Sequence, residues 1–383
     1  MRRAGDFQHR MPEVSHALRR PTSMLQRLHI DLPLLLGLML VTCFGLIVLY
    51  SASGQDFHYV KRQAVFFCIA YLAMFTVAQI RLNTFELWAP WFYGFGLLLL
   101  VAVIFFGVGA KGAQRWLSIG GFRFQPSEIL KLAMPMMVAS YLCRRILPPR
   151  LKHVFFTLLL VGIPTLLIMK QPDLGTSLLV AASGLLALFF AGLRWRYILT
   201  AFGLLLASAW PIWQFVLHGY QKQRILTMLN PEADKLGAGW NIIQSKTAIG
   251  SGGFDGKGWL NGTQSQLDFL PESHTDFIIA VLAEEFGLIG VLFLLSLYVL
   301  IIGRGMWLAY SAQDTFGRLL AGSIVFTFFV YVFVNIGMVT GLLPVVGVPL
   351  PLVSHGGTSI VTLMLGFGIV MAIGTERRRV SIG

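Results

Sequence analysis

The stretch DLPLLLGLMLVTCFGLIVLYSA, residues 31–52, carries a charge at its first position and none in the 21 residues that follow. An α-helix needs about 20 mostly apolar residues to cross the hydrocarbon core of a bilayer. The stretch therefore predicts a transmembrane helix. It is too long for the core of a signal peptide, and no small-residue cleavage pattern follows it, so we expect the helix to be retained.

Similar apolar runs recur along the whole chain of 383 residues. Apolar types make up 56% of the residues and charged types 12%, whereas soluble domains carry about 25% charged residues. A soluble protein is thereby excluded, and the short alternating strands of a β-barrel are absent. We predict an all-α polytopic membrane protein with about ten transmembrane helices, at residues 31–52, 62–80, 87–107, 127–143, 153–169, 174–192, 197–217, 276–302, 318–341 and 358–375.

The basic residues set the predicted orientation. With the N-terminus in the cytoplasm, 18 of the 30 Lys and Arg residues fall on the cytoplasmic side, in the tails and short loops. The positive-inside rule then places both termini in the cytoplasm. It also accounts for the net charge of +13 without a nucleic-acid partner. Cys43, Cys68 and Cys143 lie in or beside apolar runs and show no disulfide or metal-ligand spacing.

Composition divides the chain into five parts. They are a basic tail at 1–30, seven helices at 31–217, an extracytoplasmic loop at 218–275, three helices at 276–375 and a basic tail at 376–383. A structureless loop as long as the third part is rare unless it has a function. Its glycine-rich middle fits neither the spacing of a Walker phosphate loop nor that of a dinucleotide-binding loop. We therefore expect tight turns there.

Polar residues gather at the predicted outer ends of the helices, where an ionisable group at membrane depth suggests a functional site. Glu128 and Lys131 are three residues apart at the start of the fourth helix, so they share a helical face. We expect a buried ion pair, a part of a polar cavity, or both. Arg115 lies in the preceding outer loop. Asp173, in the next outer turn, is placed either to cap the sixth helix or to join the same cavity.

Further polar groups flank the long loop. Arg224 lies near the membrane surface after the seventh helix, where it would hold a lipid phosphate or remain a solvated loop charge. The densest run contains Glu272, His274 and Asp276 and directly precedes the eighth helix. Asp276 is placed to cap that helix or to act as a general base. Alternate loop residues form no known metal cage, so a metal site at this run is disfavoured.

Two adjacent glutamates, Glu284 and Glu285, lie about two turns deeper in the eighth helix. Such groups are costly in an apolar span unless they are neutral, paired or facing a cavity. After the ninth helix, the run GLLPVVGVPLPLVSHGGT (341–358) contains three prolines that prevent a regular helix. We expect a re-entrant-like loop at 342–357 that protein or a cavity covers. Two classes of protein then remain open, an enzyme acting on a lipid-linked anionic substrate and a transporter of that substrate.

Five runs carry a resemblance to a known family. They are GAQRWLSIGGFRFQPSEILK (112–131), KQPDLGTS (170–177), GYQKQRILTMLNPE (219–232), GSGGFDGKGWLNGTQSQLDFLPESHTDFIIAVLAEEFG (250–287) and TGLLPVVGVPLPLVSHGG (340–357). The chain resembles the SEDS family of cell-wall polymerases over essentially its whole length. Its run at 256–277 is more similar to the elongation branch of that family than to the division branch. His355 departs from the family, which usually has Tyr at this position.

The resemblance implies a peptidoglycan glycosyltransferase that polymerises lipid II on the outer face of the cytoplasmic membrane and releases undecaprenyl pyrophosphate. The alternative is a lipid II flippase. Asp276 matches the catalytic aspartate proposed for the family. The cations Arg115, Lys131 and Arg224 would stabilise the charge of the leaving group. The remaining residues expected to bind substrate are Glu128, Asp173, Glu272 and His274.

The resemblance also implies a partner, a class B penicillin-binding protein that cross-links the glycan. A divalent cation, Mg²⁺ or Mn²⁺, would share in stabilising the leaving group. The sequence shows no ligand set for such an ion.

Overall fold

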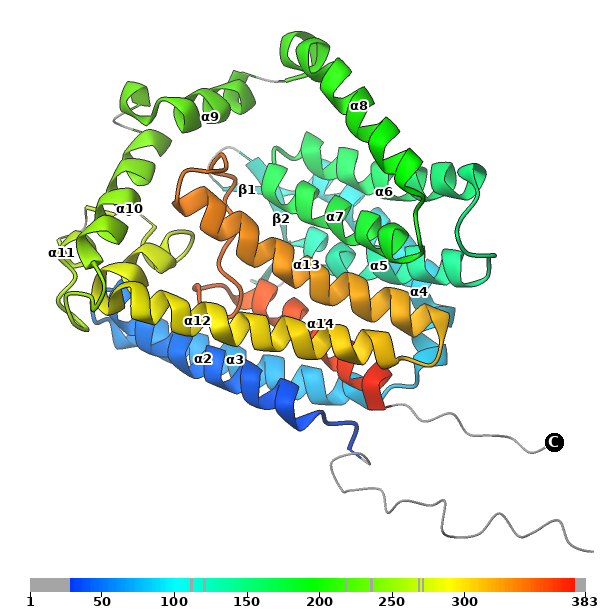
Figure 1. The fold of residues 1–383 in the computed structure, drawn as a ribbon, viewed down its shortest axis with the longest axis horizontal. Coiled ribbons are helices and arrows are strands. Elements are labelled where there is room, and N and C mark those ends of the chain that lie inside the picture. Colours follow the sequence, from blue (N-terminus) through cyan, green and yellow to red (C-terminus); the bar gives the residue numbers. More distant parts are fainter. Residues whose placement is uncertain are drawn as a thin grey trace, which may run out of the picture.

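The computed structural model describes residues 28–375, except residues 111–112, 120–121, 218, 235–236, 268 and 271. This part of the chain is predominantly helical (Figure 1). Its long helices are α2 (Leu32–Ala52), α3 (Phe57–Ala78), α4 (Leu82–Phe106), α5 (Pro126–Cys143), α6 (Leu151–Lys170), α7 (Leu174–Phe190), α8 (Trp195–Pro211), α12 (Ile278–Ser311), α13 (Thr315–Val339) and α14 (Gly357–Thr375). The basic tails predicted at 1–30 and 376–383 lie outside the described residues, apart from residues 28–30.

Each predicted transmembrane segment coincides with one of these helices. Among the described residues, eight helices are long and apolar enough to cross a membrane. The other two are α5, which carries Glu128 and Lys131 in its first two turns, and α7, which has 17 residues. The all-α polytopic membrane fold is confirmed, whereas the count of ten spans and the five-part division stay predictions.

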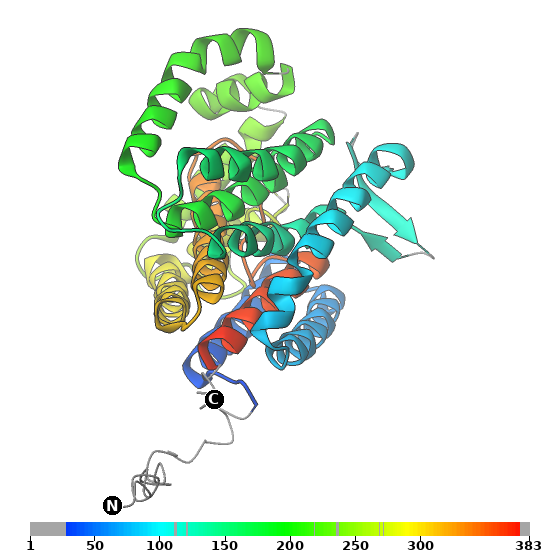
Figure 2. The ribbon, with the colours of Figure 1, turned by 90° about the vertical axis from the view of Figure 1, so that its right-hand side faces the viewer.

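The helices form a bundle in which 72% of the most apolar stretch of α13 is buried, the highest share among the eight candidate spans of the described residues. It contacts α5, α7, α12 and α14. By contrast, α8 has no buried residue and lies apart from the bundle in Figures 1 and 2. A π-helical turn (Ile212–Val216) extends α8. The site described below is therefore built around α13 rather than around α8.

One cap shows how the sequence sets a helix start. Asp31 precedes α2, and its Oδ1 accepts a hydrogen bond from the amide of Leu34 at 3.1 Å. Both carboxylate oxygens of Asp31 also accept bonds from the guanidinium of Arg304 on α12, at 3.0 and 2.7 Å. The cap thereby ties the start of α2 to α12.

A small sheet interrupts the helical fold between α4 and α5. Strands β1 (Val108–Ala110), β2 (Ala113–Ile119) and β3 (Phe122–Phe124) pair antiparallel in the order β1-β2-β3. No strand is predicted here from the sequence, because runs of three to seven residues are too short to give a clear alternating pattern. The sheet projects from the bundle in Figure 2 and carries Arg115 on β2.

The long loop predicted at 218–275 is folded. It contains α9 (Gly219–Leu229), a 3₁₀ turn (Pro231–Asp234), α10 (Ala238–Gly252) and α11 (Thr263–Gln266). Helix α10 packs against α12. Ser245 of α10 donates a hydrogen bond from its Oγ to the carbonyl of Val339, at the end of α13, at 2.9 Å. The loop therefore lies against the outer ends predicted for α12 and α13.

Residues 253–264, here called the glycine clamp, bind α12 at Gly287. This glycine has φ +62° and ψ −160°, which breaks the helical geometry inside α12. The amide of Leu288 instead donates to the carbonyl of Gly253 at 3.1 Å. A Cβ on Gly287 would lie 2.4 Å from the nitrogen of Gly256, so only glycine allows this approach. The predicted tight turns are present at three glycines with positive φ, Gly253, Gly256 and Gly258.

Residues 341–356, here called the strap, connect α13 to α14 without regular secondary structure. The hydroxyl of Tyr298 on α12 donates to the carbonyl of Pro351 at 2.7 Å. Protein thus covers the irregular backbone, as the prediction of a re-entrant-like loop requires. Four apolar strap side chains are almost fully buried, Val348, Leu350, Leu352 and Val353.

Candidate active site

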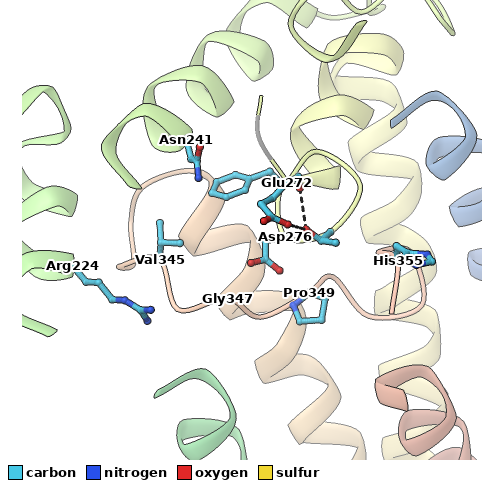
Figure 3. A pocket seen from close by; sticks show the side chains of 10 residues that line it. Arg224, Asn241, Glu272, Asp276, Val345, Gly347, Pro349 and His355 are labelled. Carbon is cyan, nitrogen blue, oxygen red and sulfur yellow. Dashed lines mark hydrogen bonds between the residues drawn. The ribbon is translucent and has the colours of Figure 1, made fainter. Parts of the chain in front are cut away.

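A cavity of about 450 Å³ opens where α9, α10, the strap and the segment before α12 meet (Figure 3). Three predicted site residues line it, Arg224, Glu272 and Asp276. Asn241 and His355 also belong to its wall. These segments are far apart in the sequence, so only the tertiary fold brings them together. Below, this space is called the aspartate cavity.

The carboxylate of Asp276 points toward the strap in Figure 3. Its Oδ2 lies 3.6 Å from the place that a Cβ on Gly347 would occupy. Gly347 has φ +74°, and without a side chain it lets the strap backbone approach the carboxylate. Phe277, not Asp276, holds the N-cap position of α12. This position disfavours the capping role and leaves Asp276 in the cavity wall.

Arg224 and Glu272 face the same space from two sides. The side chain of Arg224, on α9, extends toward Gly347 in Figure 3. Glu272 accepts a hydrogen bond at Oε2 from the hydroxyl of Thr275, at 2.9 Å. The aspartate cavity thus joins a guanidinium and two carboxylates, of Glu272 and Asp276.

A second cavity, of about 200 Å³, adjoins the first, because Gly347 and Pro349 of the strap line both. Below, it is called the ion-pair cavity. It brings together the predicted residues that lie earlier in the chain, Arg115, Glu128, Lys131 and Asp173.

His274 lines neither the aspartate cavity nor the ion-pair cavity, and its role in binding substrate stays a prediction. Its ring lies beside those of Tyr59 and His355, with centroid distances of 5.1 and 6.3 Å. Burial lowers the pKa of the His355 imidazole, and the charge of Arg62 lowers it further. Since His274 lies beside His355, which lines the aspartate cavity, His274 stands behind the cavity wall rather than in it.

Glu128 and Lys131 form the predicted ion pair. The Nζ of Lys131 lies 2.6 Å from Oε1 of Glu128, and both side chains are buried. The ammonium also lies 5.2 Å from the ring centre of Tyr331 on α13. Oε2 of Glu128 and the hydroxyl of Thr176 are buried without a hydrogen-bond partner among the described residues. Such atoms are rare in proteins unless water or a ligand satisfies them, so this wall retains capacity for a polar ligand.

Asp173 performs both predicted roles at once. It is the N-cap of α7, where Oδ1 accepts from the amide of Thr176 at 3.2 Å. Its Oδ2 accepts from the side-chain amide of Gln125 at 3.0 Å and lies 3.8 Å from Nε of Arg115. The guanidinium of Arg115 also donates to the carbonyl of Pro172. Asp173 therefore holds Arg115 in the wall of the ion-pair cavity.

The two buried glutamates of α12, Glu284 and Glu285, contact the glycine clamp and line neither cavity. Glu284 is fully buried, and its Oε1 accepts from Nζ of Lys257 at 2.7 Å and from the hydroxyl of Thr263 at 3.0 Å. Glu285 accepts from the hydroxyl of Ser51. Of the alternatives left open by the sequence, pairing is the one that the structure shows for Glu284.

Sequence analysis missed Asn335 on α13. Its side chain is fully buried, and its amide donates to the carbonyls of Asp276 and Val348. A signal was available, because Asn335 is the only side-chain amide in the apolar run at 315–339. A buried amide in such a run requires hydrogen-bond partners.

The divalent cation stays a prediction. Between residues 28 and 375, with the gaps given above, no group of three or more His, Cys, Asp or Glu side chains lies close enough to hold a metal ion.

Comparison with known proteins agrees with the fold and the motifs. The chain matches the model of the FtsW/RodA/SpoVE family, described as cell cycle protein, over residues 25–379. It is 55% identical over 355 residues to the peptidoglycan glycosyltransferase MrdB of Escherichia coli (strain K12), an alignment that covers 93% of this chain and 96% of the relative.

Two solved structures share the fold. One is a chain from a study described as "Structural coordination of polymerization and crosslinking by a peptidoglycan synthase complex", with 31% identity and a TM-score of 0.80 over 90% of this chain and 97% of that one. The other is the rod shape determining protein RodA of Thermus thermophilus, with 28% identity and a TM-score of 0.68 over 90% and 96%. The chain therefore belongs to the FtsW/RodA/SpoVE family, the SEDS family that its motifs resemble.

Proposed function

We propose that this multi-pass membrane protein is a peptidoglycan glycosyltransferase that polymerises lipid II during cell elongation and releases undecaprenyl pyrophosphate. The relative MrdB is named as a peptidoglycan glycosyltransferase. The observation that carries the proposal is the position of Asp276, whose carboxylate lies in the aspartate cavity with Arg224 and beside the ion-pair cavity.

The geometry supports a general-base mechanism. A sugar hydroxyl of the acceptor attacks the anomeric carbon of the donor, and a new glycosidic C–O bond forms. The bond from that carbon to the pyrophosphate oxygen breaks, and the hydroxyl proton passes to the carboxylate of Asp276. A positioned base contributes about 10²–10⁴-fold in rate. Arg224 in the same cavity and Arg115 in the adjoining one stabilise the negative charge of the departing pyrophosphate.

The charge of Lys131 is already compensated by Glu128 at 2.6 Å. We therefore assign this pair to maintaining the shape of the ion-pair cavity. Oε2 of Glu128 can in addition accept a hydrogen bond from a substrate hydroxyl or amide. Asp173 contributes through Arg115, which it orients. Glu272 contributes a second carboxylate to the aspartate cavity.

The proposal includes a partner and an orientation. A class B penicillin-binding protein would cross-link the glycan, and the similarity to a chain studied in a peptidoglycan synthase complex supports such an assembly. The aspartate cavity would face the outer side of the cytoplasmic membrane, with both termini inside, because the basic residues favour that orientation.

The test uses the purified chain with its penicillin-binding partner and purified lipid II in detergent. Polymeric glycan is the expected product, because detergent leaves no bilayer to cross and transport cannot mimic polymerisation. Moenomycin is expected not to inhibit the reaction. Transport of lipid II across vesicle membranes, with no polymer from any preparation, would instead support the flippase alternative.

A further inference from the structure

We propose that Asn335 is a positioning residue for Asp276. Its side-chain amide donates hydrogen bonds to the main chain of Asp276 and to the strap, and thereby determines the position of the Asp276 carboxylate in the aspartate cavity. The proposal rests on the proposed function, in which Asp276 acts as the general base.

The two hydrogen bonds of Asn335 join segments that are far apart in the sequence. Its Nδ2 donates to the carbonyl of Asp276 at 2.9 Å and to the carbonyl of Val348 at 2.7 Å. Both acceptors are carbonyl oxygens, so the amide nitrogen must face them. The opposite orientation would set Oδ1 of Asn335 against two oxygens, which cannot donate. The side chain of Asn335 is 0% exposed, and its bond to Val348 is buried, whereas its bond to Asp276 is partly buried.

Three successive carbonyls, of residues 274–276, accept hydrogen bonds in this region. The first accepts from the amide of His355 at 2.9 Å, and the second from the hydroxyl of Ser354 at 2.5 Å. Both of these donors belong to the strap. The third accepts from Asn335, which belongs to α13. Asn335 therefore links the peptide of Asp276 to α13, a helix with most of its residues buried.

The second bond of Asn335 fixes the opposite wall of the cavity. Val348 follows Gly347, whose Cβ position lies 3.6 Å from Oδ2 of Asp276. One amide thus holds both the residue that bears the carboxylate and the backbone that faces it. A misplacement of about 1 Å at a reacting group can reduce the rate about 10²-fold, so loss of this bridge should act on catalysis more than on substrate binding.

The two hydrogen bonds of Asn335 to Asp276 and Val348 come with a loss of folding free energy elsewhere in the same side chain, which supports a role beyond stability. Oδ1 of Asn335 is buried without a hydrogen-bond partner among the described residues. An unpaired buried acceptor typically costs about 1–3 kcal/mol. A side chain selected only to fill this space in α13 would more readily be apolar.

The first test replaces the amide by an apolar group of similar shape, Asn335→Leu. The variant, assembled with its partner and given lipid II, should show kcat lowered about 30–100-fold with KM changed less than about threefold. The matched control is Ser245→Ala, which also removes a buried hydrogen bond to α13 but contacts neither cavity. Its kcat should stay within about twofold of the parent. Equal losses of kcat in the two variants, or an unchanged kcat in Asn335→Leu, would overturn the proposal.

A second test asks whether Asn335 acts through Asp276. Adding Asn335→Leu to Asp276→Asn should lower the residual rate no further, because the group being positioned is already disabled. Multiplying losses would show an independent role and refute the positioning claim.

Hydrogen exchange separates this inference from the proposed function. In Asn335→Leu, peptides covering residues 273–280 and 343–350 should exchange faster than in the parent, while those covering 32–45 should not change. Unchanged exchange in the first two peptides would overturn the inference even if the enzyme is active. Faster exchange in Asn335→Leu, combined with a parent protein that makes no glycan, would leave the placement of Asp276 by Asn335 standing and the proposed function rejected.

Discussion

The Nζ of Lys257 lies 2.7 Å from Oε1 of the fully buried Glu284, and this contact joins the glycine clamp to α12. Removing one partner of a buried ion pair costs about 3–5 kcal/mol, because the other charge is left unpaired. Lys257 is partly exposed, so we expect Lys257→Met to cost near the lower end of that range. Adding Glu284→Gln should recover part of the loss. Thermal unfolding in detergent of the parent, Lys257→Met, Glu284→Gln and the double variant gives the coupling energy between the two residues. Purely additive losses of stability would show that the pair does not interact.

The break in α12 should depend on Gly287. Its φ of +62° is strained for other residues, and a Cβ would lie 2.4 Å from the nitrogen of Gly256. We expect Gly287→Ala to lower stability by more than about 2 kcal/mol. Gly303→Ala is the control in the same helix, because a Cβ there meets nothing within 4 Å. It should raise stability by up to about 1 kcal/mol. Equal melting temperatures for the two variants would contradict the role of the clamp.

The pair Glu128–Lys131 should matter for both stability and activity. Glu128→Ala and Lys131→Ala each leave a buried charge unpaired, at a cost on the order of 3–5 kcal/mol. A charge-swapped double variant restores the pair but reverses its direction in the ion-pair cavity. It should recover melting temperature better than polymerisation of lipid II. A single variant as stable and active as the parent would show that the pair contributes to neither property.

Asp276→Asn separates a base from a structural carboxylate. Asn keeps the size and accepts hydrogen bonds, but it does not take up the hydroxyl proton at neutral pH. We expect normal folding and partner binding with polymerisation reduced about 10²–10⁴-fold. Glycan gels and a melting curve measure the two properties. Near-normal polymerisation would move the search for the base to Glu272, Glu128 or Asp173.

Thiol labelling tests the orientation. In a background without Cys43, Cys68 and Cys143, single cysteines replace Thr247 on α10 and Gln313 in the turn between α12 and α13. Both positions are exposed, and the two segments lie at opposite ends of the bundle in Figure 1. In intact cells an impermeant reagent should label Thr247→Cys and spare Gln313→Cys. The reverse pattern would invert the predicted topology and the outward position of the site.

Features that depend on neighbouring residues could be predicted from the amino-acid sequence. Apolar runs located all ten long helices, because a lipid-facing helix must be apolar over its length, but α12 extends to Ser311 and so beyond its predicted end at 302. The spacing of Glu128 and Lys131 predicted their contact, since residues three apart meet on one helical face. The position of Asp173 before an apolar run likewise predicted its cap on α7.

The long-range contacts depend on the tertiary structure. Asn335 meets Asp276 across 59 positions, and Lys257 meets Glu284 across 27. No local period encodes these pairs, because they depend on how α13, the strap and the glycine clamp pack against α12. The same packing places the aspartate cavity and the ion-pair cavity on a shared wall at Gly347 and Pro349, and it keeps His274 out of that wall.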